Sequence, residues 1–386
     1  MLMAMNSNPN LRPRSSMALL LAIAVLSSTA GCKNSSSRAS EQLAKNSSDI
    51  QQLDSNLAFD NITLEQADEQ GKLLWKVKAT QATYSEDKRI AQIKLPDGDL
   101  YQDGKAIYRV KAQTGEVKQN GEKIVLRGSV VVTDLENKAV LTSEQMEWTP
   151  KTSVLIVRQN VKGTHPQVQM AANEARLYDK QDRMELRGKV VATTTNPDLQ
   201  IKSDQLIWQM KDQKIISATP IEISRFKNKR ITDVATGNQA ELNLKTKLVT
   251  LRQNAQIVTT DPSLQITSNI LNWNPNQELL STDQPVTVVQ RQDKILITAN
   301  QGQFDLQKRM AFLVGSVRAT GQRNQSQLSS DRLRWNMASR EVLSEGNVDY
   351  RQADPALHIT GPRAVGKLEN QTIVLNGGRV VTEIVP

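Results

Sequence analysis

A two-three-two spacing of apolar or small residues recurs along this chain at nearly constant intervals. In the stretch LSSDRLRW, these positions are Leu328, Ser330, Leu333 and Trp335. Steps of two are typical of a half-buried strand, and the single step of three predicts a β-bulge that bends the strand. Nine further copies exist, and the ten copies start at residues 77, 110, 141, 170, 201, 235, 266, 297, 328 and 359. This regularity identifies a repeat protein.

Each bent strand is followed by a polar turn and a returning strand that is interrupted in its middle. In IVLRGSVVV (Ile124–Val132) and MELRGKVVA (Met184–Ala192), apolar residues alternate on both sides of a glycine. Glycine inside a strand indicates a bulge or a sharp corner. A strand with such a corner contributes to two sheets. The pattern therefore predicts an all-β fold, an elongated open β-jelly roll with two facing antiparallel sheets and about ten 31-residue strand-pair units.

The composition favours sheets that bury one face over a conventional globular core. Aromatic residues make up 4% of the chain, hydrophobic residues 38%, and the mean hydropathy is −0.47. The net charge is +9, from 49 basic and 40 acidic residues, and both signs occur along the whole length without clustering. Two interpretations remain open: solvated outer strand faces, or attraction to an acidic lipid head group or membrane.

The first 56 residues lack strand periodicity and indicate a targeting segment. Arg12 and Arg14 precede an apolar run from Met17 to Leu26, which is followed by SSTAGC ending at Cys32. A basic flank, a short apolar run and small residues predict a signal peptide over residues 1–31. The stretch resembles a bacterial lipobox, although Thr29 stands where leucine is usual. We expect lipidation of Cys32, a polar tether over 32–56 and a continuous β-body over 57–386; an uncleaved anchor or a free thiol is the alternative.

The sequence offers no catalytic constellation. The two histidines, His165 and His358, lie far from any carboxylate or cysteine cluster with metal spacing, so we expect turn or outer-face positions for both. The Ser-Asp pair of SSDRL recurs in KSDQL at the same place in the unit, which indicates a role in the bend rather than hydrolysis. We therefore expect no enzyme activity, no cofactor, no metal site and no nucleic-acid partner.

Over roughly Leu57 to Thr193 the chain resembles the LptC family, the inner-membrane-anchored periplasmic component of lipopolysaccharide transport. The resemblance lies in EQGKLLWKVKATQATY, DGKAIYRVKAQTGEV followed by IVLRGSVVV, LTSEQMEW, and MAANEARLYDKQDRMELRGKV. It implies a twisted open jelly roll that accepts lipopolysaccharide from the inner-membrane ABC transporter and passes it toward the outer membrane. Two features depart from the family: a lipid anchor in place of a transmembrane helix, and about twice the usual length. We therefore divide the body into an LptC-like part, 57–200, and an extension of OstA-like repeats, 201–386.

Trp148, Trp208, Trp273 and Trp335 occur on every second unit, and either fill the space between the sheets or line a trough for acyl chains. Small residues between the rings favour an open lumen; these are Ala79, Ala112, Gly115, Ala172, Ala175 and Ala299. The expected trough-lining residues are Ala79, Tyr84, Val110, Val117, Leu141, Trp148, Leu177, Trp208, Trp273, Phe304 and Trp335.

A strand array of this kind has two open ends, and unpaired strand edges recruit other chains. The expected docking residues are Leu57, Phe59 and Ile62 at the first edge and Val380, Val381 and Ile384 at the last. The resemblance implies lipopolysaccharide as ligand. It implies as partners the jelly-roll domains of the transporter's membrane subunits and an LptA-like bridge protein or LptD-like translocon. We expect a periplasmic lipoprotein on the inner membrane of a Gram-negative-type bacterium.

Two other classes of protein remain as alternatives. A structural or adhesin-like β-repeat surface lipoprotein fits the same repeats, and a filled lumen would favour it over a lipid path. A polysaccharide-active parallel β-helix would need a cluster of catalytic side chains, which the sequence does not contain.

Overall fold

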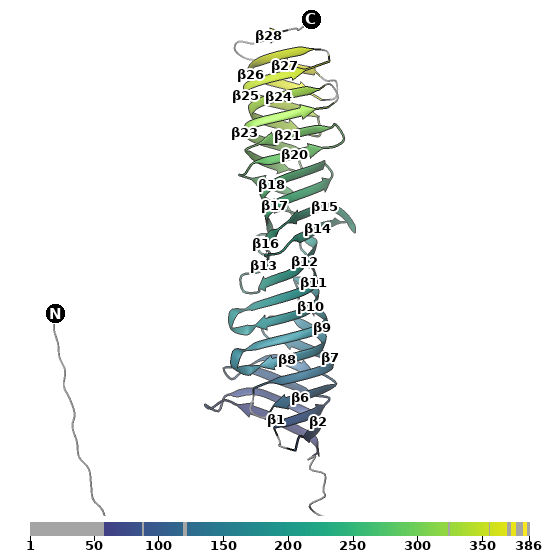
Figure 1. Ribbon diagram of the computed structural model, residues 1–386, viewed down its shortest axis with the longest axis vertical. Helices are drawn as coiled ribbons and strands as arrows, with labels where there is room; N and C mark the ends of the chain where they lie inside the picture. The colour runs from purple at the N-terminus through teal and green to yellow at the C-terminus, as the bar shows by residue number, and fades with distance from the viewer. Residues whose placement is uncertain are drawn as a thin grey trace, which may run out of the picture. The chain divides into compact units, whose positions relative to one another are not determined.

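The described residues form twenty-eight strands that follow one another as a single antiparallel sheet, folded along its length (Figure 1). The computed structural model describes residues 58–86, 89–118, 122–322, 325–354, 356–368, 372–375 and 381–383. The predicted signal segment, the tether with Cys32, and the docking residues Leu57, Val380 and Ile384 lie outside the described residues. Apart from the 3₁₀ turns η1 (Pro150–Thr152) and η2 (Asp179–Gln181), the described part of the chain contains no helix.

Fourteen strands run without interruption. They are β1 (Ala58–Ala67), β2 (Leu73–Tyr84), β7 (Ile124–Asp134), β8 (Val140–Thr149), β9 (Val154–Thr164), β10 (Val168–Tyr178), β11 (Arg183–Thr195), β12 (Asp198–Gln209), β17 (Leu248–Thr260), β18 (Ser263–Asn274), β23 (Met310–Gly321), β24 (Ser326–Asn336), β25 (Glu341–Gln352) and β26 (Leu357–Lys367).

The other fourteen strands form seven interrupted pairs, each of which occupies one level of the stack. They are β3 (Ile90–Lys94) with β4 (Asp97–Gln102), β5 (Lys105–Lys111) with β6 (Thr114–Lys118), β13 (Lys214–Ser217) with β14 (Ile221–Lys227), β15 (Arg230–Gly237) with β16 (Gln239–Asn243), β19 (Leu279–Thr282) with β20 (Val286–Gln290), β21 (Ile295–Ala299) with β22 (Gln301–Asp305), and β27 (Thr372–Leu375) with β28 (Val381–Glu383). Each level pairs with its neighbours in the sequence, always antiparallel, and the first and last described levels have one neighbouring level each.

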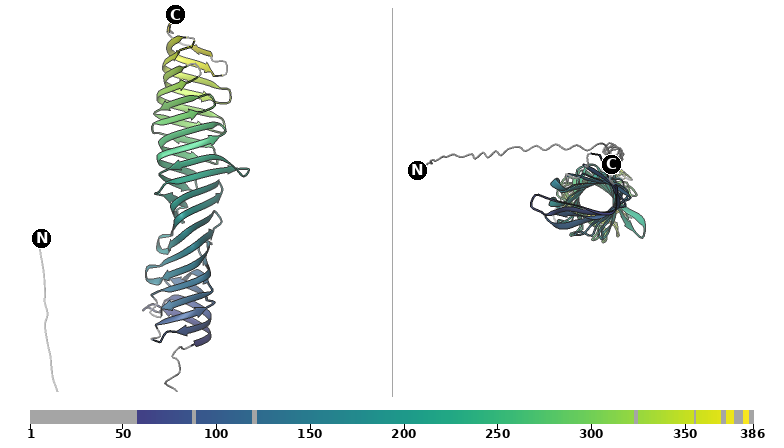
Figure 2. Two further views of the ribbon diagram at one scale, coloured as in Figure 1. Left: turned by 45° about the vertical axis from the view of Figure 1, so that its right-hand side comes forward. Right: turned by 90° about the horizontal axis from the view of Figure 1, so that it is seen from below.

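Every level bends near its middle, so that the two halves of the strands face each other across an apolar interior. Seen along the stack, the bent strands surround a common axis (Figure 2). The halves are clearest where strands are interrupted: β13 pairs with β16, whereas β14 pairs with β15. The elongated all-β jelly roll is therefore confirmed.

The turns between levels lie alternately on the two margins of this folded sheet. We call edge A the margin with the turns after β2, β6, β8, β10, β12, β16, β18, β22, β24 and β26. Edge B is the margin with the turns after β1, β4, β7, β9, β11, β14, β17, β20, β23 and β25.

The bends of the returning strands are built from two successive residues in the left-handed conformation. These pairs are Gly128–Ser129, Gln159–Asn160, Gly188–Lys189, Gln253–Asn254, Gly315–Ser316 and Gly346–Asn347, with φ between 47° and 81°. Left-handed φ is unstrained for glycine and tolerated by asparagine, but it costs about 1–2 kcal/mol for other residues. Glycine in these strands thus serves the corner that the sequence predicted.

The structure corrects the position of the bulge. Arg332 pairs with Val314 and Ser330 pairs with Val317, so two residues of β23 lie opposite the single residue Asp331 of β24. The extra residue therefore belongs to the returning strand and not to LSSDRLRW, where the spacing placed it. The strand opposite a bulge bends together with it, so its inward-facing positions are also offset by one residue. This offset explains the step of three between Ser330 and Leu333 in β24. The predicted inward set is confirmed, since Ser330, Leu333 and Trp335 are buried and Leu328 is partly buried.

In two units, the residue opposite one bulge fills the space beside the glycine of the next bulge. A Cβ atom on Gly346 would lie 2.3 Å from an Asp331 carboxylate oxygen, and one on Gly188 would lie 2.6 Å from the Asn173 amide nitrogen. Asn347 Nδ2 also donates a hydrogen bond to Asp331 Oδ2 at 2.9 Å. The structure thus supports the bend role predicted for the Ser-Asp pair.

Candidate functional site: the apolar interior and its seam

The interior is one contiguous apolar cluster that extends from Trp75 on β2 to Trp335 on β24. The predicted lining residues lie in it and are at most 5% exposed, except Tyr84, which is partly buried. Those buried residues are Ala79, Val110, Val117, Leu141, Trp148, Leu177, Trp208, Trp273, Phe304 and Trp335. The repeat therefore brings the same position of successive units to the same inner wall.

The interior is closed over most of its length, contrary to the open lumen expected from its small residues. An open channel would leave its lining accessible to water, yet Trp148, Leu155 and Trp273 are 0% exposed. The small residues instead make room for larger neighbours. A Cβ atom on Gly115 would lie 2.6 Å from a Leu126 methyl carbon. The apolar faces therefore pack against each other in this structure.

A cavity of about 140 Å³ lies near the C-terminal end of the described residues. Trp335 and Leu333 of β24 and Gly366 of β26 are among the residues that line it. Gly366 occupies the position that Trp335 and Phe304 hold in the preceding units, so the missing ring accounts for the space. The volume is below the roughly 300–1,000 Å³ of ordinary ligand pockets, but an apolar space of about 150 Å³ holds a benzene-sized group.

Four tryptophans lie just inside edge A, and we call them the tryptophan row: Trp148, Trp208, Trp273 and Trp335. The Trp148 ring meets Tyr108 of β5 edge to face, with ring centroids 6.0 Å apart. The Trp208 ring meets His165, in the β9–β10 turn of edge B, at 4.7 Å. The rings therefore touch side chains of the opposite half of the fold.

All five tryptophans bury an indole N–H that has no hydrogen-bond acceptor among the described residues. They are Trp75, Trp148, Trp208, Trp273 and Trp335. An unsatisfied buried donor costs about 1–3 kcal/mol. The interior thus combines a large apolar surface with a row of unused hydrogen-bond donors.

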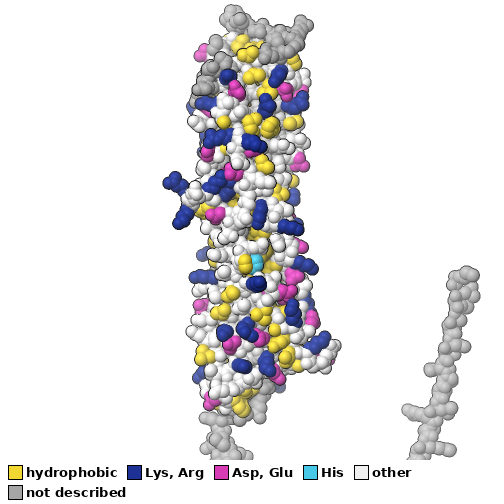
Figure 3. Space-filling model, turned by 180° about the vertical axis from the view of Figure 1, so that it is seen from behind, with side chains coloured by type: hydrophobic (Ala, Val, Ile, Leu, Met, Phe, Trp, Pro, Cys, Tyr) yellow, Lys and Arg dark blue, Asp and Glu magenta, His cyan; other side chains and the backbone are white. Residues whose placement is uncertain are grey.

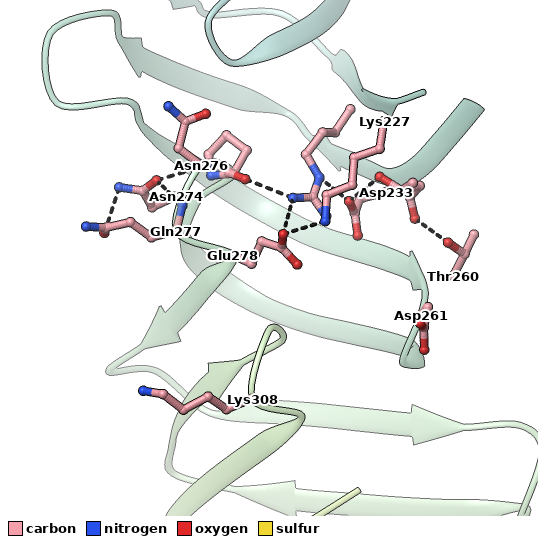
Figure 4. Close-up of polar contacts among 12 residues, drawn as sticks. Lys227, Asp233, Thr260, Asp261, Asn274, Asn276, Gln277, Glu278 and Lys308 are labelled. Carbon is pink, nitrogen blue, oxygen red and sulfur yellow. Dashed lines mark hydrogen bonds and ion pairs between the residues drawn. The ribbon is translucent and has the colours of Figure 1, made fainter. Parts of the chain in front are cut away.

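Polar side chains close the gap between edge A and edge B, and we call this line of contacts the seam (Figure 4). At its centre the Arg225 guanidinium, 6% exposed, lies between Asp233 on its own side and the turn after β18 across the gap. It donates a hydrogen bond to the Pro275 carbonyl oxygen at 2.8 Å and lies 3.6 Å from a Glu278 carboxylate oxygen. Lys227 also pairs with Glu278.

Similar contacts continue along the seam on both sides of Arg225. Asn276 Nδ2 donates a hydrogen bond to Asn196 Oδ1 at 2.7 Å. Further along, Arg309 contacts both carboxylate oxygens of Asp261 at 2.7 Å, and Arg340 pairs with Asp293. The apolar repeat pattern did not single out these residues, although Glu278, Arg309 and Arg340 recur every 31 residues as charged side chains.

The seam differs from the rest of the fold because its two margins are joined only by side chains. Within the described ranges, all strand pairings join consecutive levels, and no backbone hydrogen bond connects edge A to edge B. The exposed ion pairs of the seam, such as Arg309 with Asp261, contribute about 0.2–1 kcal/mol each, whereas the contacts of the buried Arg225 cost more to break. Separation of the two edges would therefore leave every backbone ladder intact, which makes the seam the line along which the interior can open.

Acidic side chains meet at the N-terminal part of the seam. Asp179 replaces the apolar residue that begins most edge-A turns, such as Met210 and Leu244. Tyr108 Oη donates a hydrogen bond to Asp179 Oδ1 at 3.4 Å. Burial, followed by the negative charge of Asp134 across the gap, raises the pKa of Asp179 to about 6. Partial burial of the His165 ring disfavours its charged form and lowers the pKa of His165.

The structure contains no group of His, Cys, Asp and Glu that could hold a metal ion within the residues it describes. His165 lies in a turn, as predicted. His358 lies on the edge-B half of β26, where its Nε2 is 3.3 Å from an Asp349 carboxylate oxygen.

The predicted docking residues that are described lie on terminal strands. β1 pairs only with β2, so its other edge is free among the described residues. Phe59 is 43% exposed and contacts the Tyr84 ring at 5.8 Å, whereas Ile62 is partly buried. At the other end, Val381 belongs to β28, whose only described partner is β26.

A family model described as "Lipopolysaccharide-assembly, LptC-related" matches residues 17–172, 154–232 and 225–295. These segments together span residues 17 to 295, which is 279 of the 386 residues. This chain belongs to the LptC-related family. The match continues beyond residue 200 and therefore includes part of the region that we predicted as an extension of the LptC-like part.

Other comparisons add little to the LptC assignment. No curated protein gives a significant match to the chain. The crystal structure of LptH, the LptA homologous periplasmic component of the lipopolysaccharide transport device of Pseudomonas aeruginosa, is 12% identical. The match covers 38% of this chain and 81% of LptH with a TM-score of 0.20, which supports no structural conclusion. Within the described residues of this LptC-related chain, no helix has the length and apolar character needed to cross a membrane.

We predict that Asp179→Asn stabilises the protein at pH 7.5 by about 1 kcal/mol, after allowance for the partial exposure of the carboxyl group. Because the folded state raises the pKa of Asp179 from 3.8 to about 6, it binds more protons than the unfolded state between these values. Stability from this group therefore falls as pH rises through that window, and asparagine removes the loss. Thermal unfolding at pH 7.5 and pH 4 measures the effect, which should vanish at pH 4.

Asp212→Asn is the control, since Asp212 is an exposed carboxylate in the next edge-A turn. A gain of the same size in this control, or a gain for Asp179→Asn that persists at pH 4, would contradict the assignment.

Proposed function

We propose that this chain is a periplasmic carrier that accepts lipopolysaccharide from the inner-membrane ABC transporter and passes it toward the outer membrane. Its interior would hold the acyl chains, while the saccharide part remains outside the seam. The row of buried indole N–H groups without acceptors carries this proposal most directly. Acyl chains attached through ester and amide bonds supply both apolar surface and carbonyl oxygens, and so match the two properties of the interior.

Uptake in this account begins with separation of the two edges. The closed interior has a cavity of about 140 Å³ at one end, which is too small for several acyl chains. Opening breaks side-chain contacts such as Arg309 with Asp261 but no strand pairing. Apolar surface exposed by opening is covered again by the incoming chains, at about 25 cal/mol per Å². Lipid binding therefore compensates for the opening of the seam.

The partners follow from the family and from the open strand edges. We propose that β1 pairs with a jelly-roll domain of the transporter's membrane subunits. β27 and β28 would pair with an LptA-like bridge protein or an LptD-like translocon. Cys32 would carry the lipid that anchors the chain to the inner membrane, with residues 57–200 nearest the transporter and 201–386 as the extended path. No enzymatic step belongs to this function, because the transporter would supply the energy.

A structural or adhesin-like surface lipoprotein is the second candidate, and the closed interior favours it. The LptC-related match and the unsatisfied indole groups favour transport, because a purely structural core gains nothing from unpaired donors. The two functions differ in whether lipopolysaccharide enters between the sheets.

Site-specific photocrosslinking in cells with an active transporter tests the proposed function. We expect lipopolysaccharide to crosslink to a photoreactive residue at Phe304 or Trp208, which are buried. The matched controls are Gln303, adjacent to Phe304 on β22, and Lys202 on β12, because both are exposed. Crosslinks that form only at Gln303 and Lys202 would contradict the proposal.

Trp273→Phe should weaken lipopolysaccharide binding about 5-fold, since one hydrogen bond contributes about 1 kcal/mol. The fold should lose little stability, because removal of an unsatisfied donor offsets the lost ring volume. Equilibrium binding and thermal unfolding of the purified protein measure the two effects. Phe304→Leu, which shrinks a ring without removing a donor, is the control; equal weakening in both variants would contradict a role for the indole N–H.

A further inference from the structure

Edge A carries a row of lysines that the proposed interior path does not use. Lys151, Lys180, Lys211 and Lys245 each occupy the second position of an edge-A turn, after Pro150, Asp179, Met210 and Leu244. All four are exposed, and none has a carboxylate within ion-pair distance among the residues that the structure describes. We call them the lysine row.

The backbone fixes the spacing of the lysine row. The first residue of each turn donates a backbone hydrogen bond to the last residue of the turn before it. These bonds run from Asp179 to Ser153 at 3.4 Å, from Met210 to Asp182 at 2.9 Å and from Leu244 to Gln213 at 2.8 Å. Successive turns are two strands apart, which places their lysines about 10 Å from one another along the stack. The row is thus a regular track of positive charge.

The row also stops where the seam becomes more firmly closed. The second positions of the next turns are Asn276, Gln307 and Ala338, which carry no charge. In those turns the last residues, Glu278, Arg309 and Arg340, instead form ion pairs across the seam. The turns after β8, β10, β12 and β16 therefore present the lysine row, whereas the turns after β18, β22 and β24 use Glu278, Arg309 and Arg340 for closure.

Surface charge elsewhere on the molecule is mixed. Figure 3 shows Lys and Arg interspersed with Asp and Glu along the length of one face. Most described basic residues of the strands pair with a neighbouring carboxylate, as Lys202 does with Glu222 and Lys214 does with Glu241. Carboxylates also occur within the turns of the row, namely Asp179, Asp182 and Asp212. Among the described residues, none of these three carboxylates forms an ion pair with the Nζ atom of a row lysine.

We propose that the lysine row binds the phosphate groups of a glycolipid head group while its acyl chains lie inside the fold. The inference rests on the proposed function, because it requires the ligand to protrude at the seam. Phosphate is the expected anion, since lysine ammonium groups bind it as point charges and a phosphorylated saccharide keeps it outside the apolar interior. Successive lysines would engage the same phosphate in turn, so that a ligand moving along the interior always meets a cation.

Binding of two lipids to the full-length protein tests this inference. The variant replaces Lys151, Lys180, Lys211 and Lys245 with glutamine, and the probes are lipid A with both phosphates and the same lipid without phosphates. We expect the variant to bind the phosphorylated lipid about 5- to 10-fold more weakly at low salt, since one or two exposed pairs are lost at a time. We expect the difference to shrink in 0.5 M salt, with no change for the dephosphorylated lipid.

A control variant replaces Lys78, Lys94, Lys162 and Lys189 with glutamine and therefore has the same net charge. These lysines are exposed and lie away from the edge-A turns, on β2, β3, β9 and β11. Equal losses in both variants, or equal losses for both lipids, would overturn the lysine row. Binding of both lipids with the same affinity by the natural protein would overturn the row but leave the proposed function intact. If the natural protein binds neither lipid, the lysine row and the proposed function are both overturned.

Discussion

The left-handed corner in the middle of the returning strands is the constraint on which the rest of this structure depends. Without a bend, the alternating apolar residues of each level would form one flat, half-exposed sheet. Two successive left-handed residues, such as Gly188 and Lys189, fold that sheet over so that its apolar face covers itself. Because Asn173 fills the space beside Gly188, the corner of one level also supports the corner of the next. The interior, its tryptophan row and both edges follow from the repetition of this bend.

The same bend gives the fold two kinds of cohesion with very different strengths. Along the stack, each level is held by continuous backbone hydrogen bonds to its neighbours. One such hydrogen bond contributes about 0.5–1.5 kcal/mol. Across the seam, the described residues offer only side-chain contacts, such as the pair formed by Asp261 and Arg309. Opening is therefore expected to follow the seam and not the ladder. The proposed path for lipid needs this asymmetry, because its walls would have to separate without losing their order.

Much of this fold could be predicted from one sequence because the same pattern of inward-facing residues occurs ten times along the chain. The spacing of Leu328, Ser330, Leu333 and Trp335 identified the inward face correctly. It placed the bulge on the wrong strand, because a bulge alters the periodicity of both the strand that contains it and the strand opposite. The closed interior could not be predicted either. A small residue such as Gly115 is compatible with empty space or with larger neighbours, and only three-dimensional packing distinguishes the two.

The partners across the seam could not be predicted from the sequence, for a physical reason. Its partners, such as Asn196 and Asn276, are 80 residues apart. The twist of the stack determines which turns meet, and sequence periodicity does not contain that offset. The charges at Glu278, Arg309 and Arg340 were nevertheless periodic, so a search for recurrent polar residues at turn positions would have identified one side of the contact.

In the proposed uptake, lipid enters by separation of the two edges while the strand ladder stays paired. Distance measurements between spin labels at residues 196 and 276, on opposite sides of the seam, test it most directly in the Cys32→Ser background. A second pair at Lys202 and Glu222, which face each other on β12 and β14, monitors the ladder. We expect a longer 196–276 distance when lipopolysaccharide is bound and an unchanged 202–222 distance. Saturating lipid that leaves the 196–276 distance unchanged, or that separates the ladder pair, would contradict it.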